Sequence, residues 1–269
     1  MQISQTAAVL TKFDSRPWEI STQDRPMTDS YRDDLAHIHD AGFGGFAQAA
    51  APVLVEALKA GGIDQGLVID LGCGSGILSR AIYQAGYDVL GVDISAAMIA
   101  LARQRVPRGE FRVQSLLKSE LPPAVAVAAV GEAINYLFDP ENTRSSLAKL
   151  LERIHRALQP GGVFLFDAAE PGRVPGNGLA RTYFEGNGWA VLVSSEEDRK
   201  RKFLTRRITS FRQVGEVYRR DQEVHCQRLL PRSELAAQLR SIGFRVRVLR
   251  GYGRLRFGSG HVGLLARKP

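Results

Sequence analysis

The sequence predicts an α/β protein with a doubly wound, mostly parallel seven-stranded sheet. Short apolar runs alternate with stretches of helical periodicity between residues 67 and 167, as in proteins whose helices connect parallel strands. The first apolar run passes directly into a glycine-rich turn. The 269 residues suffice for one such domain with an inserted elaboration. These three observations support the fold class.

The N-terminal part is expected to be helical only after its first 30 residues. Residues 1–30 are polar and show no period, so no packed element is predicted there. From Tyr31 to about residue 61, apolar residues recur at helical spacing, with an interruption at residues 42–45, where three glycines stand. We therefore expect a broken helical stretch before the first strand.

The first two predicted strands end in acids. Residues 67–70 end at Asp70 and continue into Gly72-Cys73-Gly74-Ser75-Gly76, and residues 88–93 end at Asp93. Glycines allow the backbone to approach a ligand closely, and the helix that follows offers free N–H groups at its N-terminus. A carboxylate at the tip of the second strand can accept both hydroxyl protons of a ribose diol.

The next three strands continue the alternation. They are predicted at residues 111–114, 125–130 and 163–166, and the continuous apolar run 125–130 is typical of a strand buried on both faces. A helix between the last two is expected to begin at Asp139-Pro140, because proline favours a first turn, and to end at Pro160-Gly161-Gly162.

The pattern changes after Asp167. Residues 171–179 are rich in proline and glycine, and residues 181–229 contain no good helix. Alternating polar and apolar positions predict antiparallel strands with one solvated face, at residues 182–186, 189–195, 203–213 and 217–228. A last helix and two strands, at residues 235–242, 244–248 and 261–265, complete the main sheet.

Residues 70–76 have the pattern D-x-G-x-G-x-G. A dinucleotide-binding turn would be G-x-G-x-x-G, but Ile77 holds the position of its third glycine. Together with the spacing to Asp93, the pattern resembles motif I of the class I S-adenosylmethionine (SAM) methyltransferases, and Pro160-Gly161-Gly162 resembles the family's turn before its fifth strand. The resemblance implies a Rossmann-like methyltransferase fold with a reversed last strand, SAM as cofactor and S-adenosylhomocysteine (SAH) as its product.

The resemblance also suggests how the chain is divided. Residues 1–61 would supply an N-terminal segment and helical lid, and residues 62–168 the SAM-binding Rossmann-like core. Residues 169–230 would form an antiparallel β insertion that covers the substrate, and residues 231–269 the C-terminal helix and the last two strands of the core.

By resemblance, the cofactor-binding residues follow the strand ends and the start of the lid. They are Tyr31, Asp70, Gly72, Cys73, Gly74, Asp93, Ile94, Met98, Ser115, Leu116 and Glu132. The motif I residues would line the methionine end, with Cys73 as a small filler. Asp93 would hold the ribose, and the four residues from Ile94 to Leu116 would surround the adenine. Met98 can equally be helix core, Glu132 a charge at a helix start and Tyr31 a surface tyrosine.

Candidate bases for the acceptor are less specific. On a strand, Glu223 and His225 share a face with Arg219, and a carboxylate beside an imidazole can orient it and raise its basicity. His225 is therefore the preferred base and Glu223 its orienter, unless that face is solvated and both are ordinary polar residues. His37 and His39 are further candidates, although residues two apart point in different directions on a helix. None of these residues has metal-ligand spacing, so no metal is expected.

Positive charge is concentrated at the C-terminal end. The net charge is +8, and residues 199–269 contain 19 Lys and Arg residues but four acids. Such a region can attract an anionic small molecule, for which Arg207 and Arg219 are candidates, or RNA, or it can be a solvated face only. Nucleic acid is less favoured, because aromatic residues for base stacking are few and no Asp/Asn-Pro-Pro-aromatic motif follows the fourth strand.

These observations predict a SAM-dependent methyltransferase that acts on an oxygen or nitrogen of a small-molecule acceptor. An RNA methyltransferase and a non-catalytic SAM-binding protein are the alternatives. Cys73 and Cys226 give no disulfide framework, and neither a signal-peptide pattern nor a membrane-spanning apolar run is found. We therefore expect a cytoplasmic protein without a membrane partner, as a monomer or homodimer.

Overall fold

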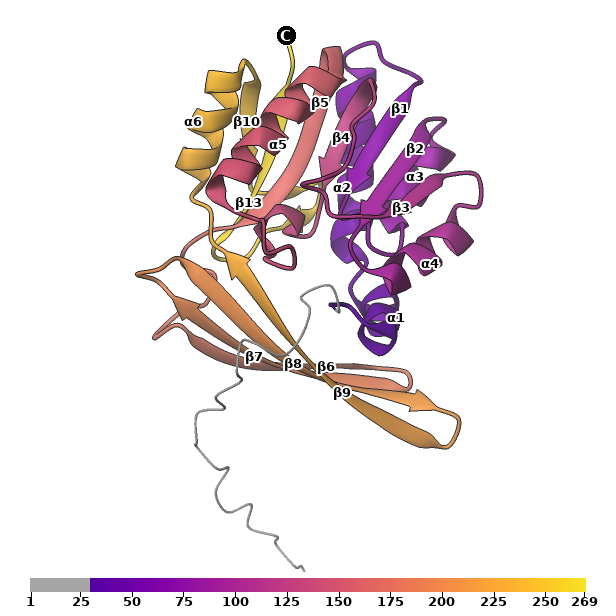
Figure 1. Cartoon of the computed structure of the whole chain (residues 1–269), viewed down its shortest axis with the longest axis vertical. Coiled ribbons are helices and arrows are strands. Elements are labelled where there is room, and N and C mark those ends of the chain that lie inside the picture. The colour runs from indigo at the N-terminus through magenta and orange to yellow at the C-terminus, as the bar shows by residue number, and fades with distance from the viewer. Residues whose placement is uncertain (1–29) are drawn as a thin grey trace, which may run out of the picture.

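The structure is a computed structural model that describes residues 30–269. The polar stretch 1–29, for which no packed element was predicted, lies outside the described residues. A seven-stranded sheet carries helices on both faces, and a separate four-stranded antiparallel sheet lies near one end of it (Figure 1). The predicted fold class is confirmed.

The helices and strands follow one another in the order of the sequence predictions, with additions. They are α1 (Asp33–Gly42), α2 (Gly45–Lys59), β1 (Leu67–Leu71), α3 (Ile77–Gln84), β2 (Asp88–Asp93), α4 (Ala96–Arg105), β3 (Glu110–Val113), β4 (Ala124–Ala129), the short 3-10 helix η1 (Ala133–Asn135), α5 (Arg144–Ala157), β5 (Leu158–Ala169), β6 (Leu179–Gly186), β7 (Trp189–Asp198), β8 (Phe203–Val214), β9 (Val217–Arg228), α6 (Arg232–Ile242), β10 (Arg245–Leu249), β11 (Gly251–Tyr252), β12 (Leu255–Arg256) and β13 (His261–Arg267).

The strand order of the large sheet places a crevice between β1 and β4. The order is β10-β13-β5-β4-β1-β2-β3, and β13 runs antiparallel to both of its neighbours. From β1 the chain moves outward to β2 and β3, and then returns to β4 on the other side of β1. Ligands of open α/β sheets bind at such a reversal, beyond the carboxyl ends of the strands.

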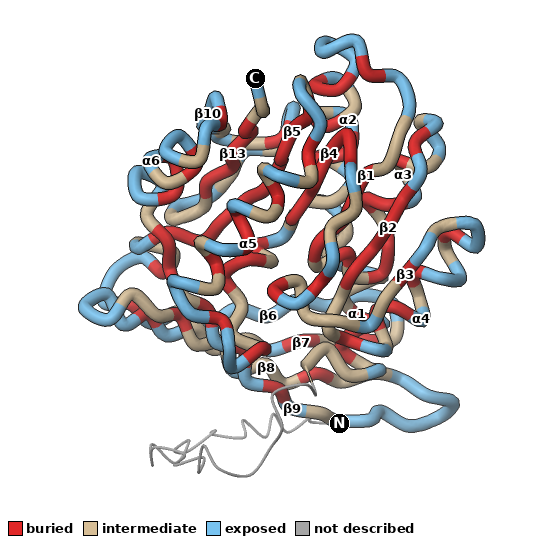
Figure 2. The backbone as a smooth tube through the Cα atoms, turned by 45° about the horizontal axis from the view of Figure 1, so that its top comes forward, coloured by how far each residue is buried: buried red, intermediate tan, exposed pale blue. Residues whose placement is uncertain are grey.

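Successive residues of the strands point to opposite faces of the sheet and pack against two layers of helices. Ile69 and Leu71 of β1 pack in the core formed with α5 and α6, whereas Val68 packs in the core formed with α2 and α3. Figure 2 shows the central strands buried along their length, with exposed chain at the periphery. Because both faces of the sheet are covered, the strand tips are the part of the sheet left for a ligand.

Several contacts join the antiparallel sheet, β6 to β9, to the core. The main chain of Tyr136 pairs with Gln227 of β9, and Asn135 donates hydrogen bonds to the carbonyl oxygens of Ala169 (2.9 Å) and Arg228 (2.7 Å). Helix α1 packs on the same sheet through Ile38, which lies in one buried cluster with Trp189 and Val191. The four predicted strands of the insertion are therefore present, and this sheet faces the strand tips of the core (Figure 1).

Three local predictions were wrong. The helix expected from Asp139-Pro140 begins at Arg144, because Thr143 and Ser146 form a capping box there and Asp139 caps a turn through the Glu141 N–H (2.8 Å). The lid helix begins at Asp33, because Tyr31 has a left-handed backbone with φ of 52°. The turn Pro160-Gly161-Gly162 belongs to β5, which already begins at Leu158.

The hairpin of β11 and β12 was not predicted, because two-residue strands have no usable periodicity. Its Tyr252 is fully buried and donates a hydrogen bond to Asp167 (3.0 Å). Among the described residues no single helix is long and apolar enough to span a membrane; α1 and α2 meet that criterion only when they are counted together across a 61° bend.

Candidate active site

A cavity of about 130 Å³ lies beyond the carboxyl ends of β1 to β4. Each of these strands contributes the residues that follow it, and the start of the lid closes the other side. The lining residues are Tyr31, His39, Gly72, Gly74, Val92, Asp93, Ile94, Met98, Ser115, Leu116, Leu117, Val130, Gly131, Ala133, Tyr136, Phe138, Asp139 and Asn142. The predicted crevice at the reversal of strand order is therefore a real cavity.

The glycine turn after β1 needs its glycines. Gly72 and Gly74 have φ of 71° and 53°, a region that residues with a side chain rarely adopt. A Cβ on Gly72 would lie 2.7 Å from the Cβ of Ala133, whereas a Cβ on Gly74 would point toward open space with only the Met98 sulfur near it, at 3.9 Å. The turn therefore presents bare backbone to the cavity at Gly74.

Asp93 joins the glycine turn to helix α4. Its Oδ2 accepts a hydrogen bond from the Gly74 N–H (2.9 Å) and its Oδ1 accepts one from the Ser95 N–H (2.9 Å). Burial raises the pKa of Asp93, and these N–H groups partly offset the rise. Because a carboxylate has about four lone-pair directions, each oxygen keeps one for a ligand.

The chemistry of this lining fits SAM. Asp93 offers acceptors suited to a ribose diol, and Met98 and Leu116 offer apolar surface suited to an adenine. The Nδ1 atom of His39 is buried without a partner among the described residues, although His39 lines the cavity. An unpaired buried polar atom in a cavity wall marks a position where a ligand or water can bond.

Most of the predicted cofactor residues are brought together. Eight of them line the cavity: Tyr31, Gly72, Gly74, Asp93, Ile94, Met98, Ser115 and Leu116. Asp70, Cys73 and Glu132 do not line it. Cys73 instead packs with Ile99 and Phe111 under α4, and burial raises the pKa of its thiol, as suits an inert filler.

Asp70 is buried behind the turn. Its Oδ2 accepts a hydrogen bond from the hydroxyl of Ser79 (2.7 Å), and burial raises the pKa of its carboxyl from 3.8 to about 7 despite that bond. The bond to Ser79 therefore holds the start of α3 against β1. Asp70 does not line the cavity because its side chain is buried behind the turn. Its contribution to binding would be through the shape of the turn.

Replacing Asp70 by Asn should make the free energy of unfolding less dependent on pH. The folded protein binds the Asp70 carboxyl proton more tightly than the unfolded chain does. The free energy of unfolding of the wild type should therefore fall by on the order of 3 kcal/mol between pH 4 and pH 7 through this group. D70N should be the more stable protein at pH 8, with a smaller difference at pH 5. Urea unfolding at both pH values tests this, with exposed Asp88→Asn as the control. A D70N protein less stable than the wild type at pH 8 would contradict it.

Glu132 follows β4 but lies outside the cavity wall, in an ionic cluster with residues of the insertion. Its carboxylate contacts Arg173 Nε (2.8 Å), Arg206 Nη1 (3.1 Å) and Gln227 Nε2 (2.9 Å). Burial by itself would raise the pKa of Glu132, but the charges of Arg206 and Arg173 lower it to about 2. Its oxygens are thus occupied by residues of the insertion, and the side chain joins the antiparallel sheet to the core.

Five aromatic rings meet at the lid side of the cavity. The ring of Tyr31 lies 4.8 Å from His225, 5.2 Å from His39, 6.0 Å from Phe138 and 6.3 Å from Tyr136, measured between ring centroids. The hydroxyls of Tyr31 and Tyr136 are 3.2 Å apart. The Tyr31 ring therefore fills a box made by the other four rings.

The predicted pair of His225 and Glu223 is formed on the inner face of β9. His225 Nε2 lies 2.8 Å from Glu223 Oε2, and both residues are buried, with 1% and 6% of their surface exposed. The alternative in which they are solvated edge residues is thereby excluded. His225 does not line the cavity, because the Tyr31 ring lies against it.

The other candidate residues lie in different environments. His37 is exposed on α1, whereas His39 lines the cavity, and burial lowers the pKa of His39 to about 4, so that its ring is neutral at pH 7. Arg219 binds Asp34 of the lid. Arg207 pairs with Val224 in the sheet register, on the face opposite to His225. The anion-binding role considered for these two arginines therefore has no support from the cavity.

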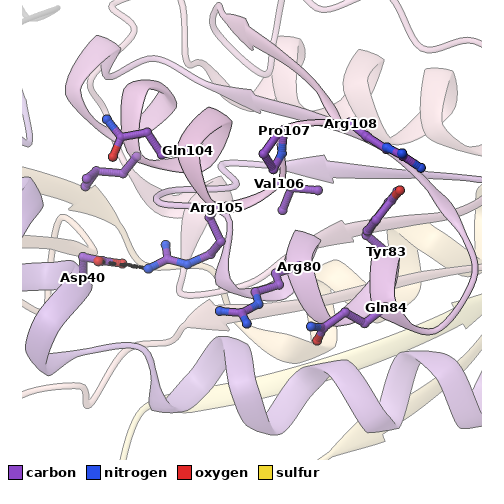
Figure 3. A pocket seen from close by; sticks show the side chains of 10 residues that line it. Asp40, Arg80, Tyr83, Gln84, Gln104, Arg105, Val106, Pro107 and Arg108 are labelled. Carbon is purple, nitrogen blue, oxygen red and sulfur yellow. Dashed lines mark hydrogen bonds and ion pairs between the residues drawn. The ribbon is translucent and has the colours of Figure 1, made fainter.

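A larger hollow lies elsewhere in the described part of the chain. It has about 810 Å³, lies between α3 and α4, and is lined by long polar side chains, including Arg80 and Arg108. In Figure 3, Arg105 reaches across it to Asp40 (2.8 Å). The smaller cavity has the more apolar wall and directed polar groups such as Asp93, as ligand sites usually do.

Sequence reasoning missed two aromatic residues of the site. Tyr136 and Phe138 line the cavity and stack on each other with centroids 4.6 Å apart. Both follow η1, and Asn142 fixes this loop by donating a hydrogen bond to the Tyr136 carbonyl (2.7 Å). Their position after the fourth strand was the available signal, since residues beyond strand tips face the crevice.

Comparison with known proteins identifies the core. A family model described as a methyltransferase domain matches residues 68–162, which include the glycine turn and Asp93. A Bacillus subtilis (strain 168) protein named as a methyltransferase, YqeM, is 25% identical over 195 residues, which cover 68% of this chain and 75% of that protein. A ubiquinone biosynthesis O-methyltransferase of Pseudomonas aeruginosa (strain UCBPP-PA14) is 33% identical over 105 residues, 36% of this chain and 42% of that protein.

Solved structures share the whole architecture. A SAM-dependent methyltransferase from Clostridium acetobutylicum ATCC 824 has a TM-score of 0.74 and 18% identity, covering 87% of this chain and 97% of that one. The sugar N-methyltransferase KedS8 from Streptoalloteichus sp ATCC 53650 has a TM-score of 0.69 and 19% identity, covering 100% and 98%. At such identities the likeness shows the fold.

The matched domain, the shared fold and the chemistry of the cavity agree with one another. All residues that line the cavity except Tyr31 and His39 lie within the matched segment, and the acid and apolar walls suit an adenosine bearing an amino-acid tail. Residues 68–162 match a methyltransferase domain, and the chain has the fold of a solved SAM-dependent methyltransferase.

Proposed function

We propose that this protein transfers the methyl group of SAM to an oxygen or nitrogen of a small-molecule acceptor, with His225 as the base. The observation that carries the proposal is the buried pair of His225 and Glu223, which a sheet of the insertion places beside the cofactor cavity. Buried carboxylate–imidazole pairs near a cavity are typical of proton-transfer sites.

The roles of the chain's own residues follow from their positions. SAM supplies an electrophilic methyl group on a sulfonium sulfur. Gly74 and Asp93 would hold the amino-acid tail and the ribose, and Tyr136 and Phe138 would exclude water from the reacting centre. Glu223 would keep the His225 ring in place, so that Nδ1 can take the acceptor's proton while Nε2 faces the carboxylate. Much of the acceleration would come from holding the two reactants together, worth roughly 7–11 kcal/mol at best.

A small-molecule acceptor is supported by the enclosure of the site. The antiparallel sheet and α1 roof the strand tips, and ion pairs from Asp34 to Arg212 (3.1 Å) and from Arg105 to Asp40 (2.8 Å) hold α1 in place. Among relatives and neighbours, the name of one gives O-methyltransferase activity and that of another sugar N-methyltransferase activity. Both chemistries therefore remain within the proposal.

RNA is the competing acceptor, because the C-terminal region is basic. Arg207 and Arg220 lie on the outer face of the antiparallel sheet, away from the cavity, so a bound RNA would not reach the strand tips from that face. A transfer assay with methyl-labelled SAM and the small-molecule and RNA fractions of a cell extract tests the choice. Label is expected in the small-molecule fraction, and label in RNA would overturn the proposal.

His225→Gln should lower kcat for the labelled acceptor by about 100-fold to 10,000-fold, the range for loss of a general base. The affinity for SAH should change by less than about threefold, because His225 does not line the cavity. Gln can keep a hydrogen bond to Glu223, so folding should be preserved. Steady-state kinetics and calorimetry measure the two quantities, and wild-type turnover by H225Q would exclude His225 as the base.

A further inference from the structure

Tyr31 separates two hollows of the molecule. It lines the cofactor cavity of about 130 Å³, and it also lines a surface groove of about 570 Å³. The groove runs between the start of the lid, the N-terminus of α4 and β9, and Ser95 and Asp221 are among its residues. Tyr31 is the residue that the walls of both spaces share.

Both the main chain and the ring of Tyr31 are held in place. Its N–H donates to Glu223 Oε2 (2.7 Å), its carbonyl accepts a hydrogen bond from the Ser95 hydroxyl (2.9 Å), and its own hydroxyl meets that of Tyr136. These bonds keep a tyrosine at φ of 52°, a left-handed conformation that residues with a side chain rarely adopt. A strained residue fixed at a ligand site points to a functional conformation.

The cavity behind Tyr31 is too small for its ligand. Ligand sites usually have volumes of roughly 300–1,000 Å³, more than twice the 130 Å³ found here. The Tyr31 ring fills the aromatic box and covers His225. Both the space and the proposed base would become available only if this ring moved.

We infer that Tyr31 is the gate between the surface groove and the cofactor cavity, and that Glu223 is the positioning residue that latches it. The inference rests on the proposed function, because it concerns access to the same site. Glu223 accepts hydrogen bonds from the N–H groups of both Tyr31 (2.7 Å) and Arg32 (2.9 Å) and also contacts His225 (2.8 Å). Closing the gate and orienting the His225 ring therefore depend on one carboxylate.

Tyr31→Ala tests the gate through binding rates. If the ring in its present position blocks entry, its removal raises the association rate constant of SAH by about tenfold or more. Surface plasmon resonance with SAH as the probe measures the association and dissociation rates. Tyr183→Ala, on the exposed outer face of the antiparallel sheet, is the matched control. A rise in the dissociation rate alone would make Tyr31 an ordinary contact, and unchanged rates would also overturn the gate.

Glu223→Gln tests the latch by hydrogen–deuterium exchange, which requires neither ligand nor turnover. The amides of Tyr31 and Arg32 should be protected in the wild type and should exchange about tenfold faster or more in E223Q. The control E196Q, at an exposed acid of β7, should match the wild type. Rapid exchange in the wild type, or equal exchange in E223Q and E196Q, would overturn the latch.

The binding-rate and amide-exchange experiments distinguish a failure of the inference from a failure of the proposed function. If the wild type does not bind SAH, the proposed function fails, and amide exchange alone decides whether residues 31 and 32 are latched. If SAH binds and the rates of Y31A equal those of the wild type, the function stands and the gate fails. If E223Q does not fold, the wild-type exchange and the Y31A rates still decide the question.

Discussion

Asp93→Ala should lower the affinity for SAH by about 100-fold or more. Two hydroxyls of a ribose would lose a charged acceptor, and each hydrogen bond to a charged group contributes about 1.5–3 kcal/mol. The carboxylate also joins Gly74 to Ser95, so its loss should loosen the turn that would receive the amino-acid tail. Isothermal titration calorimetry with SAH measures the change.

The control for this experiment lies on the same strand. Asp88→Ala removes an exposed acid at the opposite end of β2 and should leave SAH affinity unchanged. Asp93→Asn keeps one acceptor oxygen and should fall between the wild type and D93A. Wild-type affinity in a D93A protein with a cooperative unfolding transition would show that the ribose binds elsewhere.

Glu132→Ala should lower the free energy of unfolding by about 3–5 kcal/mol, the range for breaking a buried ion pair from one side. The substitution leaves Arg206 and Arg173 without their shared carboxylate between the core and the insertion. Urea unfolding at pH 7 measures the loss. The stability from this pair is fully present above pH 4.5, the ordinary pKa of the group, and declines as the pH falls toward about 2. The difference between the two proteins should therefore shrink in acid.

Glu234→Ala provides a comparison, because Glu234 also lies between two cations but at the surface. It contacts Arg144 (3.3 Å) and Lys202 (3.0 Å), and its side chain is 47% exposed. The expected loss is below about 1 kcal/mol, as for other surface ion pairs. Equal losses in E132A and E234A would mean that the Glu132 cluster does not join the insertion to the core.

The parts of the fold that the sequence predicted are those governed by local periodicity. The apolar run 125–130 and the alternation at 217–228 predicted the bounds of β4 and β9 within one residue, because the burial of a strand follows the order of apolar and polar residues along it. The start of α5 was misplaced, because Thr143 and Ser146 satisfy the first N–H groups three residues beyond the proline. The β11–β12 hairpin has too few residues for a period.

The residues of the candidate site also fall into two groups, those identified from local sequence and those whose role depends on distant parts of the chain. Glycines with a required backbone conformation and acids at strand tips are local features, so Gly72, Gly74 and Asp93 could be identified in advance. Glu132 looked equally suitable from its position after β4, but its partners, Arg173 and Arg206, come from the insertion. The direction of the Glu132 side chain depends on these two arginines, which are distant in sequence and become its neighbours only when the chain folds.

By itself, the sequence determined the α/β architecture and the strand tips that line the cavity, because both depend on residues close together in the chain. Only the tertiary structure decided that Tyr31 lies between the groove and the cavity and that Glu223 holds both Tyr31 and His225. Residues 31 and 223 are separated by most of the protein, and their hydrogen bond exists because the lid and the antiparallel sheet pack on the same end of the core.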